Sequence, residues 1–307
     1  MDSTLLNTLP LPPSALSALD AAGYETLGDL RGLPREQLEE YGIPSSMMQA
    51  IGASQAPARA PPLSQSIASM TQGPTKETRI TTGCQPLDVL LSGGLPFGTA
   101  LEISGPPGAP REPLAMNICK SFVRAQKRVL FVDFQNMHSP ASIRDTLSDI
   151  DYDKRSVLYS KILDLSHLMQ FVHSLPGYLE RHPPISLLVL SSISNPFQNA
   201  HVAAKNKIGL QSVIRAALAK ACVSQEMTVV STSQLSTKVL NADGSVGNYD
   251  TGAKGVMVPS LGDYLPEKKS YRVIVSRSSP NTGELRLFST PVGPGTVPHV
   301  EYSFDDL

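Results

Sequence analysis

The 307-residue chain predicts an α/β fold with a mostly parallel central sheet, preceded by a small all-α domain. Two observations predict it. Apolar strand-like runs alternate with helical patterns after residue 78, and a Gly/Pro-rich turn at residues 105–112 separates the first buried strand from a helix. A Pro/Ala/Ser-rich stretch precedes this region. We therefore expect a helical N-terminal domain at residues 1–52, a linker at 53–77 and a core at 78–307.

The N-terminal region predicts a small bundle of helix-hairpin-helix character. Residues 13–21 and 34–41 each begin with a proline, which suits the first position of a helix. Gly23 and Gly42 follow these segments, and glycine permits the left-handed turn that lets a next helix fold back. Residues 45–51 are expected to form the returning helix.

The charge distribution separates the two domains. Residues 1–52 hold seven carboxylates and two arginines, a net charge of −5, so the total of −1 leaves +4 for the remainder. Glu39 and Glu40 stand beside the predicted hairpin, where they disfavour contact with a polyanion. We therefore interpret the N-terminal domain as a protein-docking or structural module.

The core predicts parallel strands covered by helices on both faces, because its Val/Ile/Leu runs are nearly continuous. These runs are residues 100–104, 128–134, 185–190 and 228–231. Apolar residues at four-residue spacing predict a helix after the first strand, and a second helix is expected at 210–221. Beyond Leu261, SYRVIVSRS and GELRLFST predict a hairpin at the sheet edge, with its turn at residues 281–283.

The composition of the chain argues against several classes of protein. The chain has no run of eighteen apolar residues, and its start lacks the blocks of a signal peptide, so we expect an intracellular protein without a membrane partner. Cys84, Cys119 and Cys222 are odd in number and far apart, which predicts buried thiols and no metal site. The absence of Trp weighs against a base-stacking platform.

The turn after the first strand departs from a phosphate-binding loop at defined positions. That loop has the pattern G-x-x-x-x-G-K-[ST], and here Gly105 and Gly108 stand in a matching strand-turn-helix context. Pro110 replaces the last glycine and removes an amide donor. Arg111 replaces the lysine but keeps its charge, and Glu112 replaces the hydroxyl that holds Mg²⁺.

Glu112 lies in the first helical turn, where a carboxylate is stabilised by about 0.3–1 kcal/mol. Our hypothesis is that Glu112 satisfies the anion site from within and repels a triphosphate. Taken alone, the octapeptide is also consistent with a coincidental Pro/Gly turn before a helix.

The surrounding segments resemble the eukaryotic and archaeal RecA-type recombinases. RITTGCQPLDVLLSGGLPFGTALEISGPPG, which begins at Arg79, is similar to the segment entering their phosphate loop: an ITTG element, a Leu-Asp pair, a Leu-x-Gly-Gly turn and a Gly-x-x-x-Glu-Ile strand. Residues 129–133, 187–192 and 229–234 resemble the second core strand, the Walker B strand and the strand ending in the nucleotide-sensing Gln. Residues 234–238 and 258–262 look most like the paralogues, the C-type above all. The resemblance implies a RecA-like P-loop core.

The resemblance also implies an ATP site, but this chain differs from the family at positions that take part in ATP hydrolysis. Ser191 occupies the Walker B position, and Gln135 stands where the family has an acid. With Pro110 and Glu112 in the turn, four functional positions are altered, so we expect weak ATP binding, no strong hold on Mg²⁺, and weak or absent hydrolysis. The candidate nucleotide-binding residues are Gly105, Gly108, Arg111, Glu112, Asp133 and Gln234.

Two loops that touch DNA in the family correspond to residues 194–210 and 236–259. Their cationic residues, the candidate DNA contacts, are Lys205, Lys207, Lys238 and Lys254. These four lysines are few and are spread over two loops. We therefore expect weak, salt-sensitive binding of single-stranded DNA. Mobile solvated loops without DNA contact remain the alternative.

The resemblance implies a nuclear accessory factor in homologous-recombination DNA repair that assists recombinase assembly on single-stranded DNA. The linker lacks the Phe-x-x-Ala peptide by which family recombinases join the next subunit, so we expect a hetero-oligomer with the recombinase and other paralogues. One alternative is an active DNA-dependent ATPase that uses Arg111. Another is a non-catalytic RecA-like subunit of an unrelated assembly, such as the tRNA-modifying Elongator.

Overall fold

A computed structural model of the protein describes residues 4–30, 33–48, 79–182, 184–200, 202, 204–224, 226–243, 247, 254–292 and 298–306. The chain divides into two compact units, Met1–Thr78 and Arg79–Leu307, which are described separately. The expected linker at 53–77 lies outside the described residues, as does the end of the helix expected at 45–51.

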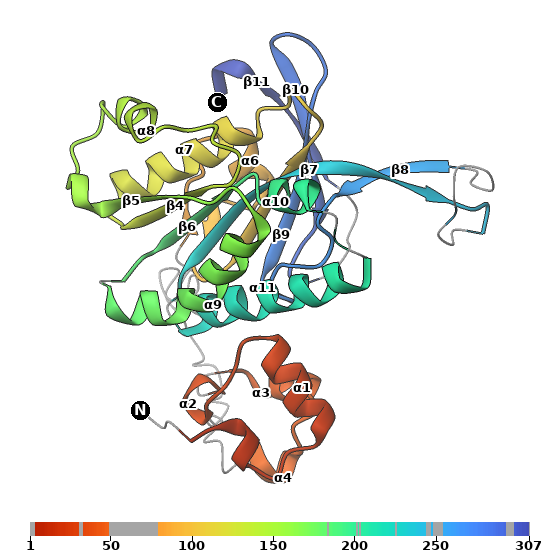
Figure 1. Ribbon diagram of the computed structural model, residues 1–307. Coiled ribbons are helices and arrows are strands. Elements are labelled where there is room, and N and C mark those ends of the chain that lie inside the picture. Colours follow the sequence, from red (N-terminus) through yellow and green to blue (C-terminus); the bar gives the residue numbers. More distant parts are fainter. Residues whose placement is uncertain are drawn as a thin grey trace, which may run out of the picture. The chain divides into compact units, whose positions relative to one another are not determined.

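The N-terminal unit is built of short helices (Figure 1). They are η1 (Leu6–Thr8), α1 (Pro13–Ala21), α2 (Leu27–Leu30), α3 (Arg35–Glu40) and α4 (Ser45–Met48). Helices α1 and α3 confirm the two helices predicted from their leading prolines. Gly23 and Gly42 adopt φ of +86° and +75°, the left-handed conformation expected of them. Leu19, Leu30 and Leu38 are fully buried between the helices.

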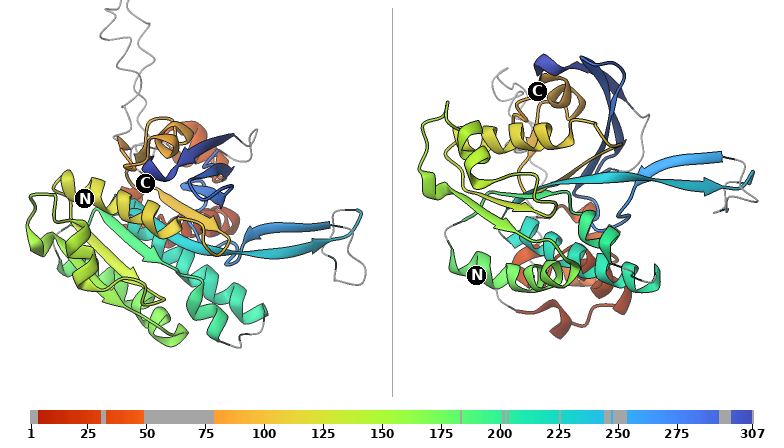
Figure 2. Two further views of the ribbon diagram at one scale, coloured as in Figure 1. Left: turned by 90° about the horizontal axis from the view of Figure 1, so that it is seen from above. Right: turned by 45° about the horizontal axis from the view of Figure 1, so that its top comes forward.

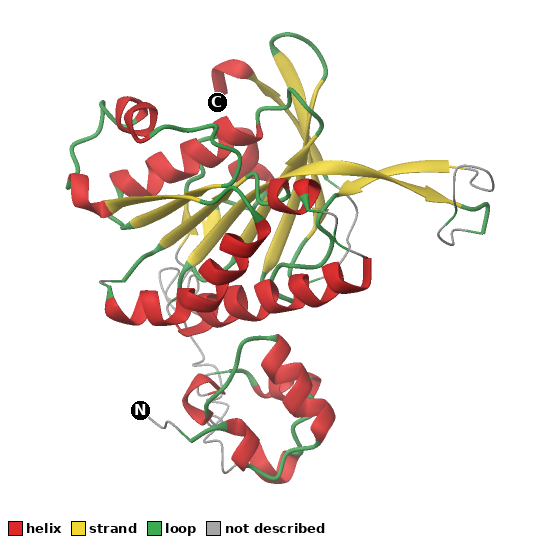
Figure 3. Cartoon of the chain, viewed as in Figure 1, coloured by secondary structure: helices red, strands yellow, loops and turns green. Residues whose placement is uncertain are grey.

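The core unit contains a nine-stranded, mostly parallel sheet, which confirms the predicted RecA-like α/β architecture (Figures 1 and 3). The strand order is β11-β10-β9-β3-β7-β6-β4-β5, and β8 pairs with β7. The strands are β3 (Ala100–Gly105), β4 (Val129–Asp133), β5 (Val157–Lys161), β6 (Leu187–Ser191), β7 (Thr228–Leu240), β8 (Lys254–Pro259), β9 (Ser270–Arg277), β10 (Thr282–Ser289) and β11 (His299–Ser303). The antiparallel pairs are β9–β10, β10–β11 and β7–β8. A small separate sheet pairs β1 (Arg79–Ile80) with β2 (Leu95–Pro96).

Helices cover both faces of the large sheet (Figure 2). On one face lie α6 (Gln85–Leu90), α7 (Arg111–Arg124) and α8 (Pro140–Thr146). On the other lie α9 (Leu165–Arg181), α10 (Asn195–Asn199) and α11 (Ala204–Ser224). The core strands therefore carry apolar residues on both faces, with Phe131 packed on one side and Leu130 and Val132 on the other. No described helix is both long and apolar enough to span a bilayer.

Parts of both predicted loops are regular structure. Helix α10 and the first turns of α11 occupy most of the predicted loop 194–210, so Lys205 and Lys207 are helical residues. In the predicted loop 236–259, β7 continues to Leu240 and pairs with β8 as a β-arm that projects from the sheet (Figure 3). Thr237, Val239 and Val256 are β-branched, which favours this extension.

The β9–β10 hairpin is confirmed, but its turn lies earlier than predicted. Strand β10 already begins at Thr282, and Gly283 pairs with Arg277, so residues 278–281 form the turn. The Ser279 hydroxyl accepts the backbone N–H groups of Asn281 and Thr282, at 3.2 and 3.1 Å. This local hydroxyl contact stabilises the turn, and the register also requires Gly283, because a Cβ atom there would lie 2.2 Å from the Ser276 carbonyl oxygen.

Candidate nucleotide-binding site

The turn between β3 and α7 brings a helix N-terminus to the carboxyl edge of the sheet. Gly105 ends β3, and a Cβ atom there would lie 2.6 Å from the Val275 carbonyl oxygen. Gly108 has φ of +82°. Only glycine meets both demands without strain, because one position has no room for a side chain and the other has a left-handed backbone. The strand-turn-helix geometry of a phosphate loop is thus present.

The turn itself offers few amide donors. Four of the residues at positions 106–113 are prolines without an N–H: Pro106, Pro107, Pro110 and Pro113. The Ala109 N–H donates to the Pro106 carbonyl at 3.1 Å, and the Arg111 N–H donates to the Ala109 carbonyl at 2.9 Å. Within these eight described positions, only the N–H groups of Gly108 and Glu112 remain for a phosphate. A phosphate loop depends on several such donors.

The Arg111 side chain is turned into the protein. It is only 8% exposed, and its Nη1 donates to the Ser233 carbonyl on β7 at 2.8 Å. The buried Nε has no hydrogen-bond partner in the described structure. Burial lowers the pKa of the guanidinium. The positive charge of Arg111 therefore lies against the backbone of β7.

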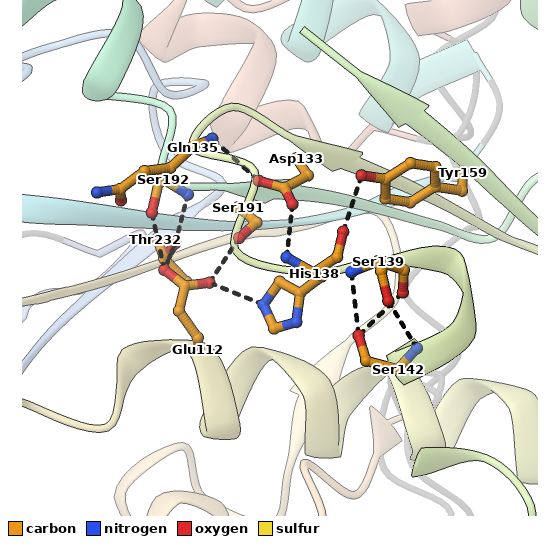
Figure 4. Close-up of polar contacts among 10 residues, drawn as sticks. All are labelled: Glu112, Asp133, Gln135, His138, Ser139, Ser142, Tyr159, Ser191, Ser192 and Thr232. Atoms are coloured by element: carbon orange, nitrogen blue, oxygen red, sulfur yellow. Dashed lines mark hydrogen bonds and ion pairs between the residues drawn. The ribbon is translucent and has the colours of Figure 1, made fainter. Parts of the chain in front are cut away.

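Glu112 joins α7 to the ends of β6 and β7 (Figure 4). Its carboxylate accepts hydrogen bonds from the Ser191 hydroxyl at 2.6 Å, the Ser192 hydroxyl at 3.0 Å and the Thr232 hydroxyl at 2.6 Å. The His138 Nε2 atom lies 3.8 Å from Oε2, an ion-pairing distance longer than a hydrogen bond. We call Glu112 and these four partners the Glu112 cluster.

Electrostatics favour the ionised form of Glu112. Burial acts to raise the pKa of its carboxyl group, but the interactions with His138, Ser191, Thr232 and Ser192 outweigh that effect and hold the pKa below its ordinary value. Three hydroxyl donors and a helix N-terminus replace the water that the carboxylate has lost. An anion built into the chain thus lies where α7 begins.

Asp133 and Gln135 lie beside this cluster with different roles. Asp133 is fully buried at the end of β4, and its carboxylate accepts the backbone N–H groups of Gln135 at 2.9 Å and His138 at 2.7 Å. Asp133 therefore shapes the turn that carries His138. The Gln135 side chain is exposed, and Figure 4 shows it pointing away from the carboxylates.

Gln234 lies at the same edge, since it pairs with Gly105 in the β3–β7 register. Its Oε1 accepts from Gln198 Nε2 at 3.0 Å, and its backbone N–H donates to the Ser194 hydroxyl at 3.3 Å. The sheet thus brings together the candidate residues on β3, α7, β4, β6 and β7. Sequence reasoning missed His138, Ser192 and Thr232; the two hydroxyl residues stand at the ends of predicted strands, whereas His138 carries no signal.

Comparison with known proteins agrees with the fold. No family model matches the chain. The chain is 23% identical to "DNA repair protein RAD51 homolog 3" of Cricetulus griseus over 88% of its own length and 82% of that protein. It is 20% identical to the protein of the same name from Dictyostelium discoideum, over 67% and 59% of the two lengths. It is 27% identical to "DNA repair and recombination protein RadB" of Halobacterium salinarum over 40% and 52%. These relatives support a RecA-type recombinase paralogue.

For a recombinase paralogue, ATP is a plausible ligand, but the residues present do not fit Mg-ATP. The metal-binding hydroxyl is replaced by Glu112, and the Walker B position holds the uncharged Ser191. No group of three or more His, Cys, Asp or Glu side chains in the described ranges forms a metal site. The site therefore does not present the usual ligand set for the metal, and its turn leaves only two open amides for the phosphates.

The candidate DNA contacts fall at the base and along the length of the β-arm. Lys207 on α11 donates to the Ser260 carbonyl at 3.1 Å, and its pKa is lowered by burial and then by the charge of Lys238. Lys238 and Lys254 are exposed on β7 and β8, while the Lys205 side chain lies outside the described part. Lys207 and Lys238 are thus brought close together, although 31 positions separate them in the sequence.

Proposed function

We propose that the protein is a non-hydrolysing paralogue subunit that assists recombinase assembly on single-stranded DNA. A role in homologous-recombination DNA repair is supported by its relatives, which are named as DNA repair proteins. The names of these relatives also suggest that the protein acts in the nucleus. The paralogue retains the RecA-like sheet and the helix that follows the turn, so its surfaces are available to recombinase-family proteins.

The observation that carries this proposal is the Glu112 cluster. In RecA-type sites the first turn of this helix supplies a hydroxyl to the metal, and the Walker B residue supplies a carboxylate. Here a carboxylate and the Ser191 hydroxyl stand in those two positions and bond each other at 2.6 Å. A triphosphate that enters must face the Glu112 charge and displace hydroxyls that are already satisfied. Nucleotide binding is therefore weak, and no residue in the cluster activates water.

Two further features support the same proposal. The turn has only two amide donors left for phosphate, and the one cation of the motif, Arg111, is committed to the Ser233 carbonyl. The active-ATPase alternative needs Arg111 to face the phosphates, which requires the loss of that buried contact. The geometry thus favours the non-hydrolysing paralogue over the ATPase.

Calorimetric titration with Mg-ATP tests the role of Glu112. We expect no measurable heat of binding for the wild type and a measurable heat of binding for Glu112→Ala, because the variant removes one like charge from the phosphate position. Glu301→Ala, which alters an exposed carboxylate on β11, serves as the matched control and should resemble the wild type. Tight wild-type binding with turnover stimulated by single-stranded DNA would support the ATPase instead.

We also propose weak, shared contact with single-stranded DNA through the β-arm. Lys238 and Lys254 supply two exposed cations, so binding should weaken modestly as salt rises. Fluorescence anisotropy with labelled poly-dT, at several salt concentrations, measures this contact. An affinity that is unchanged in Lys238→Glu would remove the arm from the proposal.

A further inference from the structure

A pocket of about 310 Å³ lies within the N-terminal unit, beside helix α1. Three segments form it: residues 5–7, one side of α1, and residues 24–25, which follow that helix. The residues that matter for its chemistry are Leu5, Leu6, Leu16, Asp20, Tyr24 and Glu25. All of them belong to the N-terminal unit, so the pocket is separate from the Glu112 cluster.

The floor of the pocket is apolar. Leu6 and Tyr24 line it and are 3% and 4% exposed. Leu16 is half-buried on α1, and Leu5 is 48% exposed although its side chain is large and apolar. An apolar side chain that enters the pocket would therefore remove surface of Leu5 and Leu16 from water, which favours binding.

The rim of the pocket is acidic. Asp20 and Glu25 are exposed and line the pocket from α1 and from the segment after it. Among the described residues that line the pocket, none is a lysine, an arginine or a histidine. Residues 1–52 as a whole carry a net charge of −5. The pocket and the unit around it therefore attract a cation.

The end of α1 adds to this negative charge. Asp20 stands in the last turn of the helix, where the backbone carbonyl groups give a partial negative charge, and no basic residue stands in that turn. A cation at such a position is stabilised by about 0.3–1 kcal/mol, whereas a carboxylate is disfavoured. A lysine or arginine of a partner beside Asp20 would supply the positive charge that the helix itself does not have.

The pocket is held in shape before any ligand arrives. Leu5 pairs with Thr26 in an antiparallel bridge, and the Leu6 N–H donates to the Glu25 carbonyl at 2.8 Å. The Asp29 carboxylate accepts the backbone N–H groups of Glu25 and Thr26 at 3.1 and 2.9 Å. These bonds hold the first segment against the segment after α1. A preformed pocket loses less entropy on binding.

We propose that this pocket docks a short basic peptide of a partner protein, in which one apolar side chain is flanked by lysine or arginine. The apolar side chain packs between Leu5 and Leu16, and the flanking cations meet Asp20 and Glu25. The same carboxylates repel a nucleic-acid strand. The pocket thus gives the N-terminal unit a specific class of ligand, and this inference does not depend on whether the core unit binds nucleotide.

An array of immobilised peptides tests this site with the full-length protein. Each peptide carries one Leu, Phe or Gly at its centre, flanked by basic, neutral or acidic residues. We expect retention on peptides with basic flanks and a central Leu or Phe. Anisotropy with labelled Gly-Lys-Leu-Arg-Gly then gives the affinity, which should fall about tenfold or more in Asp20→Lys.

Two further variants separate the site from general charge and folding. Glu36→Lys reverses an exposed carboxylate on α3 that does not line the pocket, so it changes the net charge equally and should bind like the wild type. Leu5→Ala removes part of the apolar wall without a change of charge and should also weaken binding, with an unchanged melting curve as the check on folding.

Three results would overturn the proposal. One is equal binding by Asp20→Lys and the wild type, and another is an equal loss in Asp20→Lys and Glu36→Lys, which would mean that only the overall charge matters. The third is retention without a preference for basic flanks. Labelled poly-dT that competes with the peptide for the wild type and not for Asp20→Lys would show a nucleic-acid site in its place.

Discussion

Two buried glutamates show how position decides the charge state of a residue. Glu102 lies in the middle of β3, and burial raises its pKa although Arg272, Ser233 and Tyr264 act against that rise. Glu112 lies at a helix N-terminus, and its partners hold its pKa below the ordinary value despite burial. Hydroxyl donors serve both carboxylates. The difference is that burial dominates for Glu102, which is completely enclosed in the sheet, whereas His138 and three hydroxyl groups outweigh burial for Glu112.

The stability of the protein should depend on Glu112 in a pH-dependent manner. Because its folded-state pKa is lowered, Glu112 contributes stability that is present above its unfolded pKa of about 4.3 and is lost as pH falls through the lower folded value. Glu112→Gln should therefore cost about 1–3 kcal/mol at pH 7, and this difference should shrink below about pH 4. Urea unfolding at several pH values measures it.

Glu301→Gln provides the control, because Glu301 is exposed. It should show no comparable pH-dependent difference from the wild type. A Glu112→Gln difference that grows with acidity would mean that the carboxyl group has a raised pKa, contrary to the geometry of its three hydroxyl donors.

The sequence could identify Glu112 and Ser191 as altered positions, because a fixed motif spacing marks them. It could not show that they bond each other, since 79 positions separate them and only the parallel pairing of strands brings them to one edge. His138 was missed for a related reason. Its place is set by hydrogen bonds to Asp133 that no periodic pattern encodes. Local spacing thus predicts residue identity at the site, while long-range pairing decides the contacts.

At the scale of elements, buried strands were predicted well and edge features less well. The runs of β4 and β6 are apolar on both faces, so their pattern is unambiguous. Edge strand β5 is only partly buried and mixes Val, Leu and Tyr with Ser and Lys, so neither alternation nor continuity marks it. The β-arm was predicted as a loop because it corresponds to a DNA-contacting loop of the recombinase family, yet its β-branched residues pair.

The Gly-Gly turn before β2 offers a test of backbone packing. Gly94 has φ of +111°, and a Cβ atom there would lie 2.4 Å from the Ile80 carbonyl oxygen. Gly93 has a similar φ of +104°, but a Cβ there meets nothing within 4 Å. Both alanine variants bear the left-handed backbone cost of roughly 1–2 kcal/mol, and Gly94→Ala should add about 1–3 kcal/mol for the clash.

Chemical denaturation of the two variants measures that difference directly. Gly93→Ala acts as the matched control, since it changes the same residue type with nearly the same φ in the same turn. If both variants lose the same stability, the close approach of Gly94 to β1 does not constrain the fold, and the pairing of β1 with β2 is incidental.

For the whole molecule, charge and site geometry together shape how an assembly can form. The N-terminal region carries a net charge of −5 and the remainder +4, so the core is the part suited to a polyanion. In a catalytic RecA-type subunit, bound nucleotide can favour one conformation over another. Under the proposed function, Glu112 and its hydroxyl donors occupy the nucleotide position, and no nucleotide would then bias that equilibrium.

Association of the chain with recombinase-family proteins should therefore not depend on a nucleotide bound to the chain itself. We expect co-precipitation of the recombinase and sibling paralogues with the tagged chain to be similar with Mg-ATP, with ADP and with EDTA, provided that the partner's own nucleotide state is held constant. Because Glu112→Ala removes the built-in anion, that variant should differ from the wild type only when Mg-ATP is present. Recovery of a different, non-recombinational assembly in every condition would instead support a structural subunit of an unrelated complex. A strictly monomeric chain that binds none of these proteins would contradict the proposed hetero-oligomer.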